Sequence, residues 1–333
     1  MLFIGSNKRR GALHPRPKDR GFTPLSTPLF IIPGRWESLE RYRHQDWRIW
    51  NLSASEPPAI VLVVYGSLDP DARKTYRDIR SAYRRRFPGS TVQIAFIADF
   101  IRRRLAREGT FVPSPLTALA ELREGGHAEG VVQPLTVVPG SEFHEVAALV
   151  SALGTVRGKL GFRRLAMGMP LLVSGRDFDA VSKALAPELD RVTVGGEVAA
   201  SPRDPEETAA VLVGHGTAHP ADAAYSRMAM VLKRDHRNVF LGTIDGFPGL
   251  EEALEEVRAA GVRRVRLVPF LLVAGGHARK DIAGDGSGSW KRAFEEAGFA
   301  VDLNLLGMGE NPRVVETFLE HTRRAAEGLS AGG

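Results

Sequence analysis

Cysteine is absent from this sequence. Its absence excludes disulfide bonds, thiolate metal ligands, iron–sulfur clusters and a cysteine nucleophile. Any metal site in the chain must therefore be built from histidine, aspartate, glutamate or backbone oxygen atoms.

Long apolar runs are also absent. No stretch approaches the ~20 apolar residues needed to cross a bilayer, and no signal-peptide core with a small-residue cleavage site follows the basic cluster near the N-terminus. We therefore expect a cytoplasmic protein without a membrane partner. Its 333 residues, 43% of them hydrophobic, suffice for two globular domains.

The net charge of +6 is confined to one end of the chain. Residues 1–55 contain 10 Lys and Arg against 4 Asp and Glu, which leaves 35 residues of each sign in the remainder. Residues 1–57 are also rich in proline and show no hydrophobic periodicity, so we expect a loose basic extension. Because the remaining chain is neutral, we expect no nucleic-acid partner beyond weak, non-specific attachment.

Short apolar runs alternate with amphipathic helical patterns from residue 59 onward. This alternation is typical of doubly wound α/β folds with parallel sheets. The runs that we expect to form strands are 59–66, 92–97, 131–138 and 165–172, followed by 210–214, 239–244, 265–274 and 301–307. The helical patterns include 72–86, 142–153, 221–233, 250–260, 289–297 and 312–327.

The two series of strands echo one another. The segment VVYGSLDP, which begins at Val63, matches LVGHGTAHP, which begins at Leu212, and VVQPLTVVPGSEFHE matches RLVPFLLVAGGHARKD. Each pair stands at the first and third strand of its series. We infer an internal duplication and expect two α/β lobes, residues 58–195 and 196–333.

Three candidate metal ligands follow strands of the second series. His215, Asp245 and His277 come after the runs AVLVG, VFLGTI and LVPFLLVAGG, at spacings of 30 and 32 residues. Ligands of an open parallel sheet bind beyond the carboxyl ends of its strands, where these three side chains would share one crevice. Two imidazoles and a carboxylate suit Co²⁺, Fe²⁺, Ni²⁺ or Zn²⁺ and leave coordination positions open. The pattern predicts a metal site in the second lobe.

Each of these residues also has an ordinary structural explanation. A histidine at a strand end is often a hydrogen-bonded or surface residue, and Asp245 could cap the helix that follows. Three ligand-type residues on three successive strand ends favour the metal site instead.

Five further residues are candidates for binding a substrate. Glu142 and Ser67 follow strands of the first lobe and would face the same cleft if the lobes oppose one another, although Glu142 also suits the first turn of a helix. His219 is either a second proton carrier or a loop residue. Arg279 and Lys280 would attract the carboxylates of an anionic substrate or, equally, begin a solvated helix.

With these motifs, the sequence resembles the anaerobic cobaltochelatases, the class II chelatases that insert Co²⁺ into sirohydrochlorin in cobalamin biosynthesis. The resemblance covers about residues 59–327, and its most specific segments are VGHGTAHP, PFLLVAGGHARKDIAGDGSGSWK and GMGENP. It implies two flavodoxin-like, chelatase-type lobes related by duplication, with the metal in the cleft between two histidines and an acid.

The resemblance carries the family's two histidines onto His215 and His277 and its acid onto Asp245. The family pattern has Glu at the position of Asp245, and the shorter side chain could alter the choice of metal or the ligand distance. Thr136 is a second departure, because relatives commonly have His there.

The resemblance implies an enzyme that acts on a tetrapyrrole with eight carboxylates and needs no organic cofactor. His215 and His277 are the candidates for catalysis, because an imidazole with a pKa of ~6.5 accepts a proton near neutral pH. The alternatives are a ferrochelatase or nickel chelatase on the same scaffold, or a tetrapyrrole or metal carrier without catalysis. A homo-oligomer is compatible with the sequence, which does not determine the oligomeric state.

Overall fold

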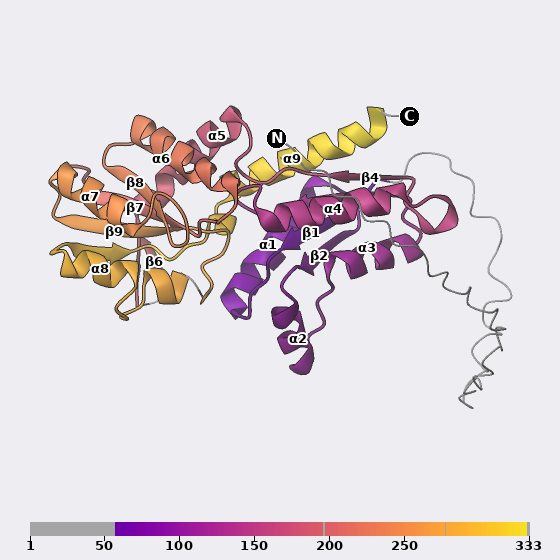
Figure 1. The fold of residues 1–333 in the computed structure, drawn as a ribbon, viewed down its shortest axis with the longest axis horizontal. Helices are drawn as coiled ribbons and strands as arrows, with labels where there is room; N and C mark the ends of the chain where they lie inside the picture. Colours follow the sequence, from indigo (N-terminus) through magenta and orange to yellow (C-terminus); the bar gives the residue numbers. More distant parts are fainter. Residues whose placement is uncertain (1–56, 196, 277, 332–333) are drawn as a thin grey trace, which may run out of the picture. The chain divides into compact units, whose positions relative to one another are not determined.

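The computed structural model describes residues 57–195, 197–276 and 278–331. The chain divides into residues 1–54 and 55–333, and the description concerns the second unit (Figure 1). Three predictions fall on residues outside this description: the loose leader over residues 1–57, which overlaps it only at residue 57, the site residue His277, and the lobe boundary at residue 196.

The first lobe is built on a parallel four-stranded sheet with the order β2-β1-β3-β4. Its strands are β1 (Ala59–Val64), β2 (Val92–Phe96), β3 (Glu129–Pro134) and β4 (Arg164–Met167). Every residue of β1 and β3 is buried, as expected for central strands covered on both faces.

The second lobe repeats this arrangement with the order β10-β9-β7-β8. Its strands are β7 (Thr208–Gly214), β8 (Val239–Thr243), β9 (Arg264–Phe270) and β10 (Ala300–Leu303). In both lobes the first strand lies between the second and the third, and all neighbours are parallel. The identical strand order confirms the predicted α/β fold with two lobes of parallel sheet and is the order that a duplication would produce.

Helices cover both faces of each sheet. The first series contains α1 (Pro70–Arg86), α2 (Asp99–Arg107), α3 (Pro115–Glu124), α4 (Ser141–Thr155) and α5 (Gly175–Leu185). The second contains α6 (Ala223–Asp235), α7 (Leu250–Ala260), α8 (Trp290–Glu296) and α9 (Pro312–Ala331). Short helical turns are η2 (Gly158–Leu160), η3 (Ala186–Asp190), η4 (Pro220–Asp222), η5 (Ala278–Ile282, a π-helix) and η6 (Met308–Glu310).

The observed elements differ from the predicted ones mainly at their ends. Predicted strands at the third and fourth positions of each series end earlier, because their apolar residues continue into the loops beyond the sheet. The loop after β9, for example, pairs its backbone with another loop: Met308 N–H donates to Leu271 O at 2.8 Å. An antiparallel hairpin of β5 (Arg191–Val194) and β6 (Glu197–Ala200) joins the two series and was not predicted.

One hydrophobic core runs through both lobes. It contains Ile60 and Leu62 of β1 together with Ala210 and Leu212 of β7. The alternate residues of β1 face a second core beneath α3 and α4, and those of β7 face a third beneath α7 and α8. The lobes therefore share one core, and each has another of its own.

Two helices cross from one lobe to the other. Helix α9 follows the second sheet in sequence but packs against β3 and β4 of the first (Figure 1). Helix α5 follows the first sheet but packs against α6, where the Arg227 guanidinium lies over the Phe178 ring at 4.4 Å from the ring centroid. Within the described residues, no helix is both long enough and apolar enough to cross a membrane.

Candidate metal-binding cleft

Two of the predicted metal ligands lie side by side at the carboxyl edge of the second sheet. His215 follows β7 and Asp245 follows β8, and the Asp245 N–H donates to the His215 carbonyl at 2.8 Å. The His215 Nδ1 atom lies 3.9 Å from Asp245 Oδ2, and the two side chains are 46% and 64% exposed. Asp245 does not cap the next helix, because the N-cap of α7 is Gly249.

The hydrogen bonding of His215 fixes the orientation of its imidazole. Its Nδ1 atom lies 3.1 Å from the carbonyl oxygen of Gly216. A carbonyl only accepts, so Nδ1 carries the proton and the lone pair of the neutral ring lies on Nε2. A backbone carbonyl that orients a histidine in this way is the usual outer partner of a metal-ligating imidazole.

Asp222 holds together the loops that carry His215 and Asp245. Its Oδ1 accepts from Thr217 N at 3.0 Å, and its Oδ2 accepts from Phe247 N at 2.7 Å. Both loops are therefore hydrogen-bonded to one carboxylate, that of Asp222 in η4. Asp222 was not predicted from the sequence, where its only signal is its place at the start of a helix, between the two loops.

Gly216 allows these two loops to approach each other. Its φ of 80° favours glycine, and a Cβ atom there would collide with the backbone nitrogen of Gly246. In the GHG motif, His215 thus supplies an imidazole. Gly216, which has no side chain, lets the loop with Asp245 come close.

The first lobe has no metal-binding pair at the equivalent place. Ala98 N–H donates to the Tyr65 carbonyl at 3.0 Å, as Asp245 N–H does to His215. Tyr65 and Ala98 therefore occupy the positions of His215 and Asp245, and neither provides the imidazole or carboxylate that suits a divalent first-row metal. Both lobes therefore share this loop geometry, and the imidazole and carboxylate stand at these two positions in the second lobe.

The two lobes meet through equivalent loops. A Cβ atom on Gly275 would lie 3.3 Å from Ser67 Oγ, and one on Gly140 would lie 3.6 Å from Thr217 Oγ1. Each contact joins the loop after the first strand of one lobe to the loop after the third strand of the other. Ser67 is buried at this contact, and its Oγ accepts from Asp69 N at 3.1 Å.

Glu142 lies in the first turn of α4, two residues beyond Gly140. Burial raises the pKa of the Tyr225 phenol in the second lobe, and the charges of Asp222 and Glu142 act in the same direction. Glu142 is thus close enough to the second lobe for its charge to act on a residue there.

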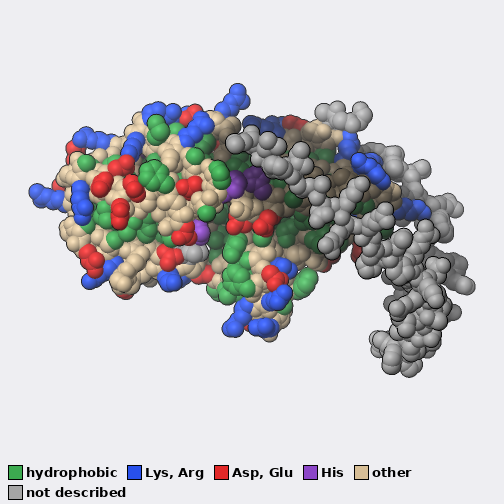
Figure 2. Space-filling model, viewed as in Figure 1, with side chains coloured by type: hydrophobic (Ala, Val, Ile, Leu, Met, Phe, Trp, Pro, Cys, Tyr) green, Lys and Arg blue, Asp and Glu red, His purple; other side chains and the backbone are tan. Residues whose placement is uncertain are grey.

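His144 and His219 bring imidazoles from the two lobes together. Their ring centroids are 4.9 Å apart, with 40° between the planes, and Figure 2 shows adjoining histidine side chains on the surface. His144 is exposed, and its ring faces that of His219. The sequence could not show this contact, because the two histidines are 75 positions apart.

Arg279 is paired with acids of the first lobe. Its guanidinium lies 2.9 Å from a carboxylate oxygen of Asp69 and 2.9 Å from one of Asp71, at the start of α1. Lys280 is exposed, and no ion pair joins it to another residue of the described ranges. Of the two predicted cations, Arg279 therefore connects the lobes, whereas Lys280 forms no ion pair within the described residues.

The complete predicted trio is not part of the description, because His277 lies outside it. Among residues 57–195, 197–276 and 278–331, no group of three or more His, Asp or Glu side chains could hold a metal ion. His215 and Asp245 lie side by side, and the role of all three residues as metal ligands stays a prediction.

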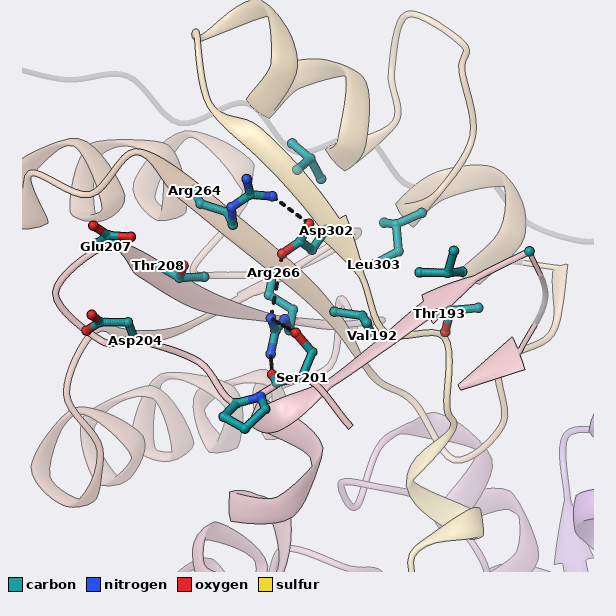
Figure 3. A pocket seen from close by; sticks show the side chains of 14 residues that line it. Val192, Thr193, Ser201, Asp204, Glu207, Thr208, Arg264, Arg266, Asp302 and Leu303 are labelled. Carbon is teal, nitrogen blue, oxygen red and sulfur yellow. Dashed lines mark hydrogen bonds and ion pairs between the residues drawn. The ribbon is translucent and has the colours of Figure 1, made fainter. Parts of the chain in front are cut away.

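A hollow of about 680 Å³ lies away from this edge, where Arg264 and Thr208 begin β9 and β7 (Figure 3). Its cations are already engaged: Arg264 pairs with Asp302 at 2.8 Å, and Arg266 donates to Ser201 O at 2.7 Å. We regard it as a structural feature, because ligands of such sheets bind at the opposite ends of the strands.

Comparison with known proteins identifies the family of this chain. The family model described as "Cobalt chelatase (CbiK)" matches residues 58–327. The chain is 33% identical, over 299 residues, to a protein of Nitratidesulfovibrio vulgaris strain Hildenborough named sirohydrochlorin cobaltochelatase CbiKC, covering 90% of this chain and 99% of that one. It is 32% identical, over 232 residues, to the sirohydrochlorin cobaltochelatase of Salmonella typhimurium strain LT2, covering 69% and 81% of the respective chains.

Solved structures share the fold at low sequence identity. SirB from Bacillus subtilis with Fe³⁺ gives a TM-score of 0.57 at 17% identity, covering 82% of this chain and 97% of that one. The sirohydrochlorin chelatase SirB of Bacillus subtilis subspecies spizizenii in complex with cobalt gives 0.54 at 18% identity, with the same coverage. The two-lobed architecture and a family match across both lobes lead to one conclusion: this chain belongs to the CbiK cobalt chelatase family.

Proposed function

We propose that this protein is a sirohydrochlorin cobaltochelatase, an enzyme that inserts Co²⁺ into sirohydrochlorin for cobalamin biosynthesis. The observation that carries the proposal is the pair of His215 and Asp245 at adjacent strand ends, with the His215 lone pair on Nε2. Two relatives named for this activity support it.

The metal substrate is held by His215, Asp245 and His277. Two imidazoles and one carboxylate form a ligand set that suits Co²⁺, and three protein ligands leave positions for the pyrrole nitrogens. A shell that is incomplete without the macrocycle allows the ion to be handed on.

The chemistry requires the ion to lose water and the macrocycle to lose two pyrrole protons. His215 and His277 are the catalytic bases in this proposal, because a neutral imidazole released from the metal accepts a proton near neutral pH. Asp245 offsets the charge of the ion as the nitrogen atoms replace the protein ligands.

The macrocycle lies between the lobes, with Glu142 and Ser67 on one side and His219, Arg279 and Lys280 on the other. Lys280 binds a substrate carboxylate directly, whereas Arg279 must first exchange its partners Asp69 and Asp71. We propose that the enzyme needs no organic cofactor. We also propose that it is cytoplasmic.

The proposal is tested by anaerobic absorption spectroscopy of the purified full chain with sirohydrochlorin and Co²⁺, Ni²⁺ or Fe²⁺. We expect Co²⁺ insertion well above the spontaneous rate. The substitutions His215→Ala and His277→Ala should each lower the rate by about a hundredfold, the usual order for losing a group that transfers protons.

His127→Ala is the matched control, because this partly buried imidazole precedes β3 at the other end of the sheet. It should insert Co²⁺ at the wild-type rate. A wild-type rate no faster than the spontaneous reaction, with tight binding of both substrates, would identify a carrier instead. Faster insertion of Ni²⁺ or Fe²⁺ would assign another metal.

A further inference from the structure

His219 has the opposite hydrogen-bond arrangement to His215, four residues earlier in the same loop. Its Nδ1 atom accepts from Ala221 N–H at 3.1 Å, which makes it the N-cap of η4. The lone pair of the neutral ring is used at Nδ1, so Nε2 carries the hydrogen.

This tautomer limits what His219 can do. A neutral imidazole that accepts at Nδ1 has no lone pair on Nε2, so in this state it neither ligates a metal nor takes a proton there. It presents an N–H donor. The ring is half-buried, and that of His144, from α4 of the other lobe, lies 4.9 Å away between centroids.

The surroundings of the pair point to a substrate group on the rim of the macrocycle. His144 is two residues beyond Glu142, and His219 is two beyond Thr217, the residue next to Gly140 at the contact between lobes. The pair thus stands beside the predicted cleft and receives one imidazole from each lobe. A ligand that engages both rings must touch both lobes.

We propose that His144 and His219 form a carboxylate-binding pair that fixes the orientation of the tetrapyrrole between the lobes. The inference rests on the proposed function, and it assigns a binding site to one peripheral carboxylate of the tetrapyrrole. His219 Nε2–H donates to that carboxylate, and His144 contributes a second donor from the first lobe. His219 acts as a positioning and specificity residue here, in place of the proton carrier considered from the sequence.

The decisive substitution is His219→Asn. Asparagine is a good N-cap residue, so its side-chain oxygen can replace Nδ1 as the acceptor of Ala221 N–H. Its amide does not reach the position of Nε2. The substitution therefore separates the capping role from the donor role, whereas His219→Ala removes both.

The experiment measures the dissociation constant of metal-free sirohydrochlorin by fluorescence titration, together with Co²⁺ affinity in the absence of tetrapyrrole. We expect His219→Asn and His144→Leu each to weaken sirohydrochlorin binding by about tenfold, the order expected for one hydrogen bond to a charged group. Co²⁺ affinity should be unchanged. In the double variant the two effects should not add, because both rings serve the same carboxylate.

Three results would overturn the inference. If His219→Asn bound sirohydrochlorin as tightly as the wild type, His219 would not act as a donor. If His219→Asn or His144→Leu bound Co²⁺ more weakly, the pair would belong to the metal site. A defect restricted to His219→Ala would reduce His219 to a helix cap. A wild-type protein that fails to bind sirohydrochlorin would refute the proposed function itself, which is a separate outcome.

Discussion

At the scale of single residues, the backbone decides what each histidine of the GHGTAH segment can do. His215 faces a carbonyl, which only accepts, and His219 faces an amide N–H, which only donates. The two neutral rings therefore differ at the same atom, Nε2, which carries a lone pair in His215 and a hydrogen in His219. A sequence with two histidines four residues apart contains no sign of this difference.

Asp222 is the residue whose loss should affect the metal site without touching the metal. In Asp222→Asn, one of the two carboxylate oxygens becomes an NH₂ group, so one of the hydrogen bonds to Thr217 N and Phe247 N is lost. The loops of His215 and Asp245 should then separate. We expect Co²⁺ affinity to fall by about tenfold, the lower end of the range for residues that support metal ligands.

Competition with a chromophoric chelator would measure this change. Asp78→Asn is the control, because Asp78 is an exposed residue of α1 that pairs only with Lys74 among the described residues. Equal Co²⁺ affinities in Asp222→Asn and the wild type would show that the loops keep their spacing without this carboxylate.

At the scale of elements, the sequence predicted the strands well because buried parallel strands are continuous apolar runs. Strand order, the hairpin β5–β6 and the crossing of α5 and α9 were not predicted, since these depend on partners far away in the chain. The rule for strand ends correctly brought His215 next to Asp245. It could not reveal the pairing of Arg279 with Asp71, because these residues are 208 positions apart.

Helix α9 is attached to the first lobe by buried polar groups. Thr322 Oγ1 donates to Gln133 Oε1 at 2.9 Å, and His321 Nε2 lies 3.2 Å from Asp177 Oδ1. Burial acts to raise the pKa of Asp177, but hydrogen bonds from the Ser174 backbone and side chain, together with His321, outweigh it, and the pKa is lowered. The ionised carboxylate therefore stabilises the fold.

This lowered pKa predicts a loss of stability in acid. A carboxyl whose pKa is lower in the folded state stabilises the protein fully above its unfolded pKa of about 4, and this contribution disappears as the pH falls through the folded value. Asp177→Asn should lower the free energy of unfolding at pH 7 by about 1–3 kcal/mol. Its stability should then change less than that of the wild type below about pH 4.

Urea unfolding followed by circular dichroism, between pH 7 and pH 3, would measure both effects. Asp99→Asn is a suitable control, because that carboxylate is half exposed and pairs with Arg102 and Arg103 on the surface of α2. Parallel stability curves for Asp177→Asn and the wild type would contradict the assignment of acid sensitivity to Asp177.

At the scale of the whole molecule, the shared core makes the two lobes one folding unit. A duplicated protein could unfold lobe by lobe, but here α5 and α9 each pack across the divide. Their apolar side chains lie in the core that contains both β1 and β7. The predicted cleft would therefore lie between lobes that this shared core joins.

Phe318 of α9 tests this cooperativity. It is fully buried in the shared core, and Phe318→Ala should lower the free energy of unfolding by about 3–5 kcal/mol, because it leaves a cavity. Calorimetry should still show one transition at a lower temperature, and hydrogen exchange should show equal loss of protection in β1 and β7. Phe111→Ala, at a side chain that is 71% exposed, should change neither the transition temperature nor the hydrogen-exchange protection of the two strands. If β7 kept its protection while β1 lost it, the lobes would be separate folding units, and the cleft would lie between independent domains.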